Sequence, residues 1–182
     1  GLGTDVLAAY SIVSRVFAFL QCPSFGIGNA VAPIMGQNLG AGRPARGERA
    51  TRLGLQASFV VTLAIYVVVN LASSGILGFL TKDVAVAAIA TQALRFTMFS
   101  GIGAGLMLVA GSALAGAGDA VAPMLSNMAA LWLVQLPACW ILSRPLGLGA
   151  LGMWLGIVLG NSAGATIIIL QFRRGRWKEI AL

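Results

Sequence analysis

The sequence predicts an all-α membrane protein, a polytopic bundle of five transmembrane helices. Only 9% of its 182 residues are charged and 58% are hydrophobic, whereas about 25% of the residues in an ordinary soluble domain are charged. A soluble surface needs about 25–35% charged side chains, so the composition excludes a soluble enzyme. Five uncharged runs follow one another, at residues 16–42, 53–81, 96–118, 120–143 and 145–172.

Each uncharged run exceeds the about 20 residues that a helix needs to cross the hydrocarbon core. Backbone in lipid must satisfy its own hydrogen bonds, which favours helices over strands. We place the five spans near residues 6–35, 51–79, 84–114, 121–142 and 149–172. Pro23 in the first span and Pro137 in the fourth each remove a backbone hydrogen bond and predict a kink.

The basic residues predict the orientation of the spans. Two clusters hold most of them, and five spans place both clusters on one side: Arg43, Arg46, Arg49 and Arg52, then Arg173, Arg174, Arg176 and Lys178. The opposite side has only Lys82 and Arg144. Positive residues collect in the cytoplasm, so the N-terminus is expected outside and the C-terminus in the cytoplasm. Trp140, Trp154 and Trp177 are expected to anchor the helices at the membrane interfaces.

The net charge of +7 does not indicate a nucleic-acid partner, because the basic residues lie between long uncharged runs and not on a soluble surface. The five acidic residues all lie at predicted helix ends or in connections, and the chain has no histidine. No carboxylate is therefore available inside a span to bind a proton or sodium ion. The sequence offers no catalytic constellation, no metal site and no cofactor site.

Polar and adaptable side chains inside the spans are the candidates for a substrate cavity. They are Arg15, Gln21, Asn29, Gln92, Arg95, Met128 and Gln135. Arg15 and Arg95 sit at matching depth, where a charge usually faces a watery cavity; the alternative is that both side chains extend to the outer interface. Met128 belongs to a methionine and tryptophan stripe that suits either varied ligands or simple core packing.

Glycine recurs at every fourth position of the fifth span, at Gly152, Gly156, Gly160 and Gly164. Such a row lets a neighbouring helix approach closely. We expect these residues to serve helix packing, either static or as a sliding surface.

Short motifs around the connections resemble the multidrug and toxic compound extrusion (MATE) family. Residues 36–42, Gly-Gln-Asn-Leu-Gly-Ala-Gly, are similar to the signature after the second helix of a MATE lobe, and Pro44 and Arg46 continue it. Residues 116–119, Gly-Ala-Gly-Asp, and the following Pro123 and Met124 are similar to a later cytoplasmic turn. The similarity extends over nearly the whole chain and in the right order.

This resemblance implies helices eight to twelve of a two-lobe, twelve-helix antiporter in a bacterial inner membrane. The transporter would export small organic compounds, often cations, in exchange for H⁺ or Na⁺. The chain begins at Gly1 without methionine, so the N-terminal lobe and the first helix of this lobe are expected upstream. Since no acid lies within the spans here, the resemblance assigns the coupling ion to that other lobe.

Two other functions stay open from the sequence. A related flippase for lipid-linked precursors would use Arg15 and Arg95 to bind an anionic headgroup. A truncated membrane fragment or subunit would not transport at all.

Overall fold

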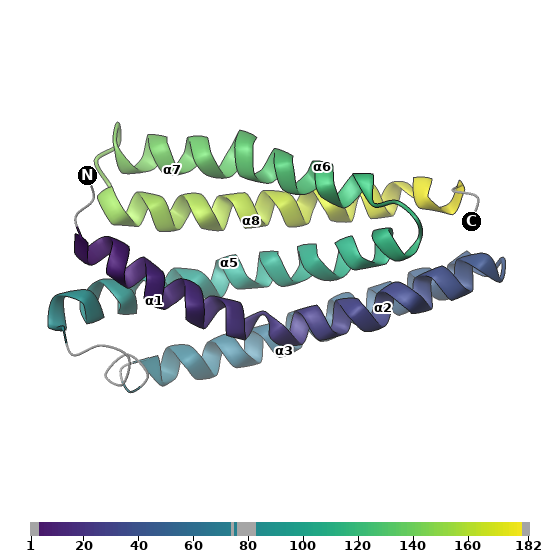
Figure 1. Ribbon diagram of the computed structural model, residues 1–182, viewed down its shortest axis with the longest axis horizontal. Coiled ribbons are helices and arrows are strands. Elements are labelled where there is room, and N and C mark those ends of the chain that lie inside the picture. Colours follow the sequence, from purple (N-terminus) through teal and green to yellow (C-terminus); the bar gives the residue numbers. More distant parts are fainter. Residues whose placement is uncertain (1–3, 74, 76–82, 180–182) are drawn as a thin grey trace.

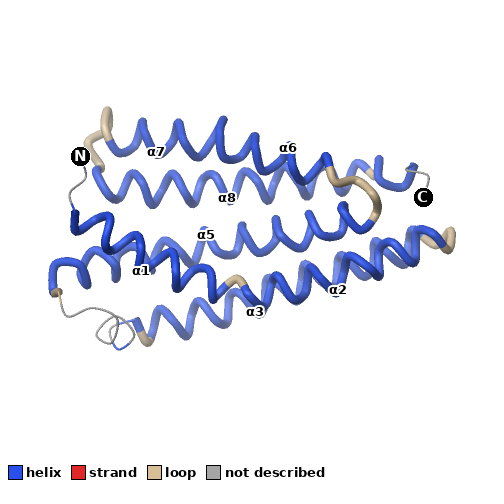
Figure 2. The backbone as a smooth tube through the Cα atoms, viewed as in Figure 1, coloured by secondary structure: helices blue, strands red, loops and turns tan. Residues whose placement is uncertain are grey.

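The computed structural model describes residues 4–73, 75 and 83–179, and within them every regular element is helical (Figures 1 and 2). This confirms the predicted all-α membrane bundle. The elements are α1 (Thr4–Leu20), α2 (Cys22–Gly40), α3 (Pro44–Leu71), α5 (Val84–Gly116), α6 (Val121–Ala129), η1 (Ala130–Gln135), α7 (Leu136–Ser143), α8 (Gly149–Arg174) and η2 (Arg176–Glu179).

The long helix α5 lies in the middle of the bundle and contacts α1, α2, α3 and α8. On the far side of α8, the segment α6–η1–α7 packs along its length. A helix contacted on so many sides is expected to be apolar over most of its surface, and α5 is so apart from polar positions such as the exposed Gln92 and Arg95. Its buried residues join two apolar clusters, one against α2 and α8 and the other against α1.

Four helical segments are long and apolar enough to cross a membrane within the part of the chain that the structure describes. They are Pro44–Leu71, Phe99–Gly116, Val121–Ser143 and Gly149–Arg174. The helix predicted over 51–79 begins earlier, at Pro44; its positions 74 and 76–79, like Lys82, lie outside the described residues.

The first predicted span, 6–35, is not one continuous helix. It divides at Gln21 into α1 and α2, and Pro23 occupies the first turn of α2. Proline has no amide hydrogen and its ring displaces the preceding turn, so the hydrogen-bond ladder is interrupted here. The kink predicted from Pro23 therefore takes the form of a break between two helices.

The fourth predicted span is continuous but not uniformly α-helical. Residues Ala130–Gln135 form a π-helix that ends two residues before Pro137. Pro137 has no amide hydrogen to donate to the preceding turn, and the wider π-helical turn accommodates the carbonyl group that is left without a donor. At the position where Pro137 predicts a kink, the structure therefore has π-helical turns in place of a break in the helix.

Two glycine-containing turns reverse the chain at the same end of the bundle. Gly42 has φ 68° and Gly118 has φ 87°, a left-handed conformation that costs glycine little. Asp119 then accepts a hydrogen bond from the amide of Ala122 at 3.0 Å, which caps α6. The two Gly-Ala-Gly segments therefore have the same role, which is to reverse the chain in the α2–α3 and α5–α6 connections.

The two basic clusters lie at one end of the bundle, as the charge pattern predicts. The α2–α3 turn, the α5–α6 turn and the C-terminus share that end in Figure 1. Lys178 in η2 donates to Glu48 in α3 at 2.8 Å. This ion pair joins the two clusters directly.

The tryptophans expected at the membrane interfaces differ in their surroundings. Trp140 is 59% exposed, whereas Trp154 and Trp177 are 3% and 1% exposed. Trp177 stacks on Phe172 with ring centroids 5.3 Å apart and donates to the Phe172 carbonyl oxygen at 2.9 Å. Trp154 and Trp177 are therefore packing residues within the bundle, because neighbouring helices cover their rings.

Three buried hydroxyl groups join α2 to α3. Ser24 Oγ lies 2.9 Å from Ser58 Oγ and 3.0 Å from Thr62 Oγ1. Gly105 of α5 faces them, and a Cβ there would come within 2.7 Å of Ser24 Oγ. The absence of a side chain at position 105 thus makes room for the hydroxyl network.

Replacing Ser24 by alanine is expected to destabilise the protein by about 1–3 kcal/mol, because it leaves the Ser58 and Thr62 hydroxyls without their shared partner. Unfolding by denaturant in detergent micelles would measure the loss. Thr166→Ala is the matched control, since this exposed hydroxyl bonds only within its own helix, to Ser162. Equal effects of the two substitutions would contradict a special role for the network.

Candidate functional site

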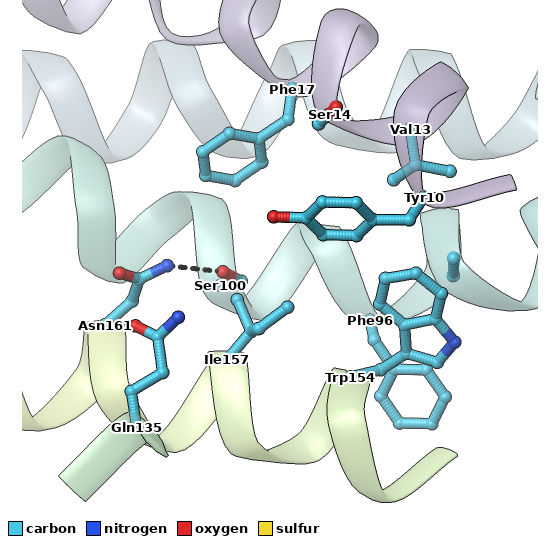
Figure 3. A pocket seen from close by; sticks show the side chains of 11 residues that line it. Tyr10, Val13, Ser14, Phe17, Phe96, Ser100, Gln135, Trp154, Ile157 and Asn161 are labelled. Atoms are coloured by element: carbon cyan, nitrogen blue, oxygen red, sulfur yellow. Dashed lines mark hydrogen bonds between the residues drawn. The ribbon is translucent and has the colours of Figure 1, made fainter. Parts of the chain in front are cut away.

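A cavity of about 220 Å³ opens between α1, α5, α8 and η1. Figure 3 shows its lining side chains converging from these elements. They are Tyr10, Val13, Ser14, Phe17, Ala93, Phe96, Ser100, Gln135, Trp154, Ile157 and Asn161. Most of the surface is aromatic or aliphatic and the polar groups are few, which is the usual make-up of a small-molecule site.

Aromatic rings form the wall of the cavity. Tyr10 of α1 and Trp154 of α8 stack with centroids 6.0 Å apart and an interplanar angle of 21°. Phe17 lies two turns further along α1 and contacts the ring of Tyr66 at a centroid distance of 6.5 Å. Aromatic faces attract organic cations through their quadrupoles. The wall therefore suits a flat or cationic organic compound.

Neutral amide and hydroxyl groups supply the polar part. Asn161 of α8 donates to Ser100 of α5 at 2.6 Å, a bond drawn in Figure 3. Gln135 lies beside them on η1, where a Cβ at Gly160 would come within 2.8 Å of its Oε1. Among the described residues that line this cavity, Tyr10 with its phenol is the one ionisable group. The cavity can therefore bind through hydrogen bonds and aromatic faces without holding a fixed charge.

The glycine row of α8 determines how closely this cavity is enclosed. Cβ atoms at Gly152, Gly156 and Gly160 would collide with Leu142, Cys139 and Gln135 respectively, and a Cβ at Gly164 would lie 2.6 Å from Met107 Sδ. The row thus lies against α7, η1 and α5. It brings η1 near enough to α8 for Gln135 to reach the cavity.

Of the seven cavity residues predicted from the sequence, the structure brings only Gln135 to this site. Arg15, Asn29, Gln92, Arg95 and Met128 are exposed on the described part of the chain. Gln92 and Arg95 line a separate, shallow depression along α5. Gln21 sits at the break between α1 and α2, where its Oε1 is buried without a hydrogen-bond partner. The role of these six residues stays a prediction.

Several cavity residues were not found from the sequence, chiefly Tyr10, Phe17, Ser100, Trp154 and Asn161. Asn161 carried a usable signal, because an amide in the middle of an apolar run needs a hydrogen-bond partner. The aromatic residues carried none, since aromatic rings serve both as anchors at the membrane interface and as packing residues. Ser100 and Asn161 are 61 residues apart, so only the packing of α5 on α8 joins them.

The sequence is similar to a known protein family and to bacterial relatives named as probable multidrug resistance proteins. Residues 1–141 match the MatE family. The probable multidrug resistance protein NorM of Deinococcus radiodurans is 31% identical over 176 residues, which cover 93% of this chain and 39% of that protein. A NorM of Rhodopseudomonas palustris is 30% identical over 172 residues, with 92% and 36% covered.

Solved MATE transporters have the same fold. The transporter ClbM, in complex with Rb⁺, matches with a TM-score of 0.90 at 20% identity, over 97% of this chain and 42% of ClbM. Vibrio cholerae VcmN in its bent form also gives 0.90 at 20% identity, over 97% and 40%.

The chain spans about two fifths of the length of these relatives. The family matches more than three quarters of the chain, from residue 1 to residue 141 of 182. This agrees with the resemblance carried by the Gly-Ala-Gly turns and their flanking residues. The chain therefore belongs to the MatE family, whose structurally characterised relatives are membrane transporters.

Proposed function

We propose that this chain is one lobe of a multidrug efflux antiporter, which exports small organic compounds, often cations, in exchange for H⁺ or Na⁺. Family membership supports efflux, since the relatives that match are named multidrug resistance proteins. The observation that carries the proposal for this chain is the aromatic and amide-lined cavity between α1, α5, α8 and η1. The other lobe would hold the coupling ion.

The proposed location is a bacterial inner membrane, with the lipid bilayer and the second lobe as the partners of this bundle. The two basic clusters at one end support a cytoplasmic position for that end. Alternating access, in which two bundles rock about a central site, is the proposed mechanism. The break at Gln21 and the π-helical turns of η1 are the places where the helices of this lobe can bend.

Phe17 and Phe19 allow a matched test of the cavity. Both belong to α1, but Phe17 lines the cavity whereas Phe19 is 78% exposed outside it. Loss of one aromatic face costs a bound cation about 1 kcal/mol, which corresponds to about fivefold weaker binding. Phe17→Leu is therefore expected to raise the half-saturating dye concentration about fivefold, and Phe19→Leu to leave it unchanged.

The measurement is extrusion of a fluorescent organic cation from efflux-deficient cells. These cells express the protein in the form that its natural host makes. Imposed H⁺ and Na⁺ gradients, applied separately, identify the coupling ion. No extrusion under either gradient would overturn the proposed function. Extrusion that Phe17→Leu and Phe19→Leu weaken equally would overturn the assignment of this cavity.

A further inference from the structure

A crevice of about 600 Å³ lies at the basic end of the bundle, between α3 and α8. Its lining is divided by chemistry: Arg52, Arg173 and Glu48 are charged, whereas Leu55, Ile169 and Phe172 are apolar. A second, shallower depression adjoins it along α3 and shares Glu48 and Arg52 with it. This crevice is separate from the proposed transport cavity, which is lined by other residues.

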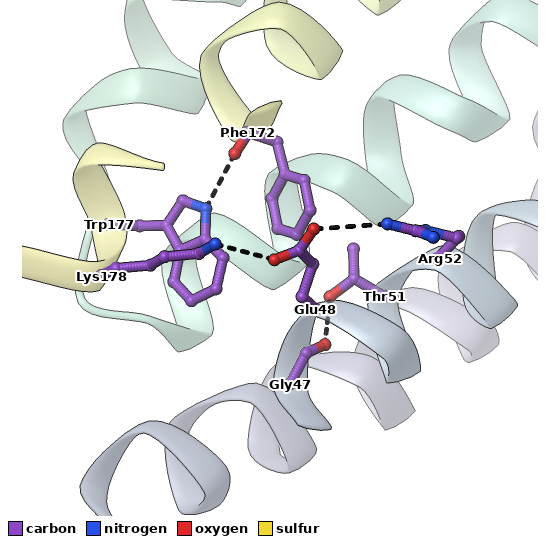
Figure 4. A network of polar contacts seen from close by, with 7 residues as sticks. All are labelled: Gly47, Glu48, Thr51, Arg52, Phe172, Trp177 and Lys178. Atoms are coloured by element: carbon purple, nitrogen blue, oxygen red, sulfur yellow. Dashed lines mark hydrogen bonds and ion pairs between the residues drawn. The ribbon is translucent and has the colours of Figure 1, made fainter. Parts of the chain in front are cut away.

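Among the described residues, one acid, Glu48, lines the crevice, and its charge is already neutralised. Glu48 accepts from Lys178 Nζ at 2.8 Å through one oxygen and from Arg52 at 3.3 Å through the other (Figure 4). Arg52, Arg173 and Lys178 against Glu48 leave two positive charges around the opening. The Arg52 side chain is 70% exposed, so most of its N–H groups remain available to an anion.

The apolar part of the crevice continues along α3 away from this basic end. Leu55 and Phe59 are four residues apart and therefore share a face of α3, and Phe59 is 43% exposed. The charged groups lie at the mouth of the crevice, and the apolar residues lie beyond them along α3. The headgroup and acyl chain of a membrane lipid follow each other in the same order. Basic pockets between transmembrane helices on the cytoplasmic side are known to bind anionic headgroups.

We propose that this crevice binds an anionic phospholipid of the cytoplasmic leaflet, with its phosphate between Arg52 and Arg173 and one acyl chain along Leu55 and Phe59. The inference rests on the proposed orientation of the bundle, but not on which compound is exported. The planar guanidinium groups supply paired N–H donors for phosphate oxygens. Lys178 contributes indirectly, because it holds Glu48 away from the phosphate.

Native mass spectrometry of the protein as the cell makes it, purified in detergent, tests this site. The probe is dioleoyl phosphatidylglycerol, which is anionic, and dioleoyl phosphatidylcholine, which is zwitterionic with no net charge, is the comparison. One basic residue near anionic lipid contributes about 1 kcal/mol, which corresponds to about fivefold in affinity. Arg52→Gln and Arg173→Gln are each expected to weaken phosphatidylglycerol binding about fivefold and to leave phosphatidylcholine unaffected.

Arg174→Gln is the matched control, since Arg174 is the next residue, makes the same change of charge and lines a different depression beside α6. It is expected to leave binding unchanged. Equal weakening by Arg173→Gln and Arg174→Gln would show general charge attraction and would overturn the site, as would unchanged binding in the Arg52 and Arg173 variants. Arg52→Lys keeps the ion pair to Glu48 and should recover part of the affinity if folding is intact.

Soluble glycerol phosphate separates a lipid site from a phosphate site. If glycerol phosphate displaces the bound phosphatidylglycerol at an equal concentration, the acyl chain contributes nothing and the assignment to lipid is wrong. No displacement is the expected result. Because binding is measured without transport, an unchanged protein that exports dye but does not bind phosphatidylglycerol would refute this inference and leave the proposed function intact.

Discussion

Trp177→Ala is expected to reduce the free energy of unfolding by about 3–5 kcal/mol, the usual cost of removing a buried tryptophan. Trp177 is 1% exposed and belongs to the same apolar cluster as Met35 of α2, Leu114 of α5 and Ile168 of α8. Its ring closes the basic end of the bundle, and Lys178 lies 5.2 Å from the ring centroid. Without this ring the cluster would open to water, and η2 would lose its main attachment.

Denaturant unfolding in detergent micelles, followed by far-UV circular dichroism, would measure this change. Trp177→Phe keeps a stacking ring but loses the 2.9 Å hydrogen bond to the Phe172 carbonyl oxygen. The lost hydrogen bond should add about 1 kcal/mol to the cost of the smaller ring. Trp132→Ala is the control, since Trp132 is 62% exposed. If Trp132→Ala and Trp177→Ala destabilise equally, the burial of Trp177 is not what stabilises this end.

Gly116→Ala is expected to destabilise the protein by about 3 kcal/mol, although alanine normally favours a helix over glycine. A Cβ at position 116 would collide with the carbonyl oxygen of Ala32 and lie 2.7 Å from its carbonyl carbon. The contacted atoms are backbone, which cannot move aside as a side chain can. Overpacking of this kind typically costs about 1–3 kcal/mol, and the rigid contact places this case at the upper end.

Gly26→Ala is the matched control, because a Cβ there would meet no atom within 4 Å. Alanine should stabilise that helical position by about 0.5–1 kcal/mol, so the two glycine substitutions are expected to act in opposite directions. Thermal unfolding of the detergent-purified protein would show the difference as melting temperatures above and below that of the unchanged protein. A stabilising Gly116→Ala would show that α2 and α5 lie further apart than the structure places them.

Much of the fold could be predicted from local patterns. Long uncharged runs predicted the helices, and the basic clusters predicted which connections share an end, a prediction confirmed by the Lys178–Glu48 pair. Pro23 and Pro137 marked the places where the α-helical hydrogen bonding is interrupted, because proline alters its own hydrogen-bond ladder wherever it occurs. The form of each interruption, a break between α1 and α2 in one case and the π-helix η1 in the other, was not predictable from the sequence.

Less of the cavity could be predicted from the sequence. Arg15 and Arg95 were singled out as charges deep in the spans; both side chains are exposed on this bundle and lie outside the cavity, and their role stays a prediction. Asn161 and Ser100 meet at 2.6 Å without any shared motif. A helix that is apolar over most of its surface, such as α5, has too weak a periodic pattern for its rotation about its own axis to be inferred.

The sequence by itself determined the membrane-spanning class, the order of the helices, the shared basic end and the MatE family. These properties follow from length, charge placement and short motifs, which are local along the chain. Only the tertiary structure decided which side chains line the cavity, that Trp177 is buried, and that Arg52 and Arg173 flank one crevice. Those facts depend on the rotation and register of helices against each other, which close glycine contacts such as Gly116 on Ala32 determine.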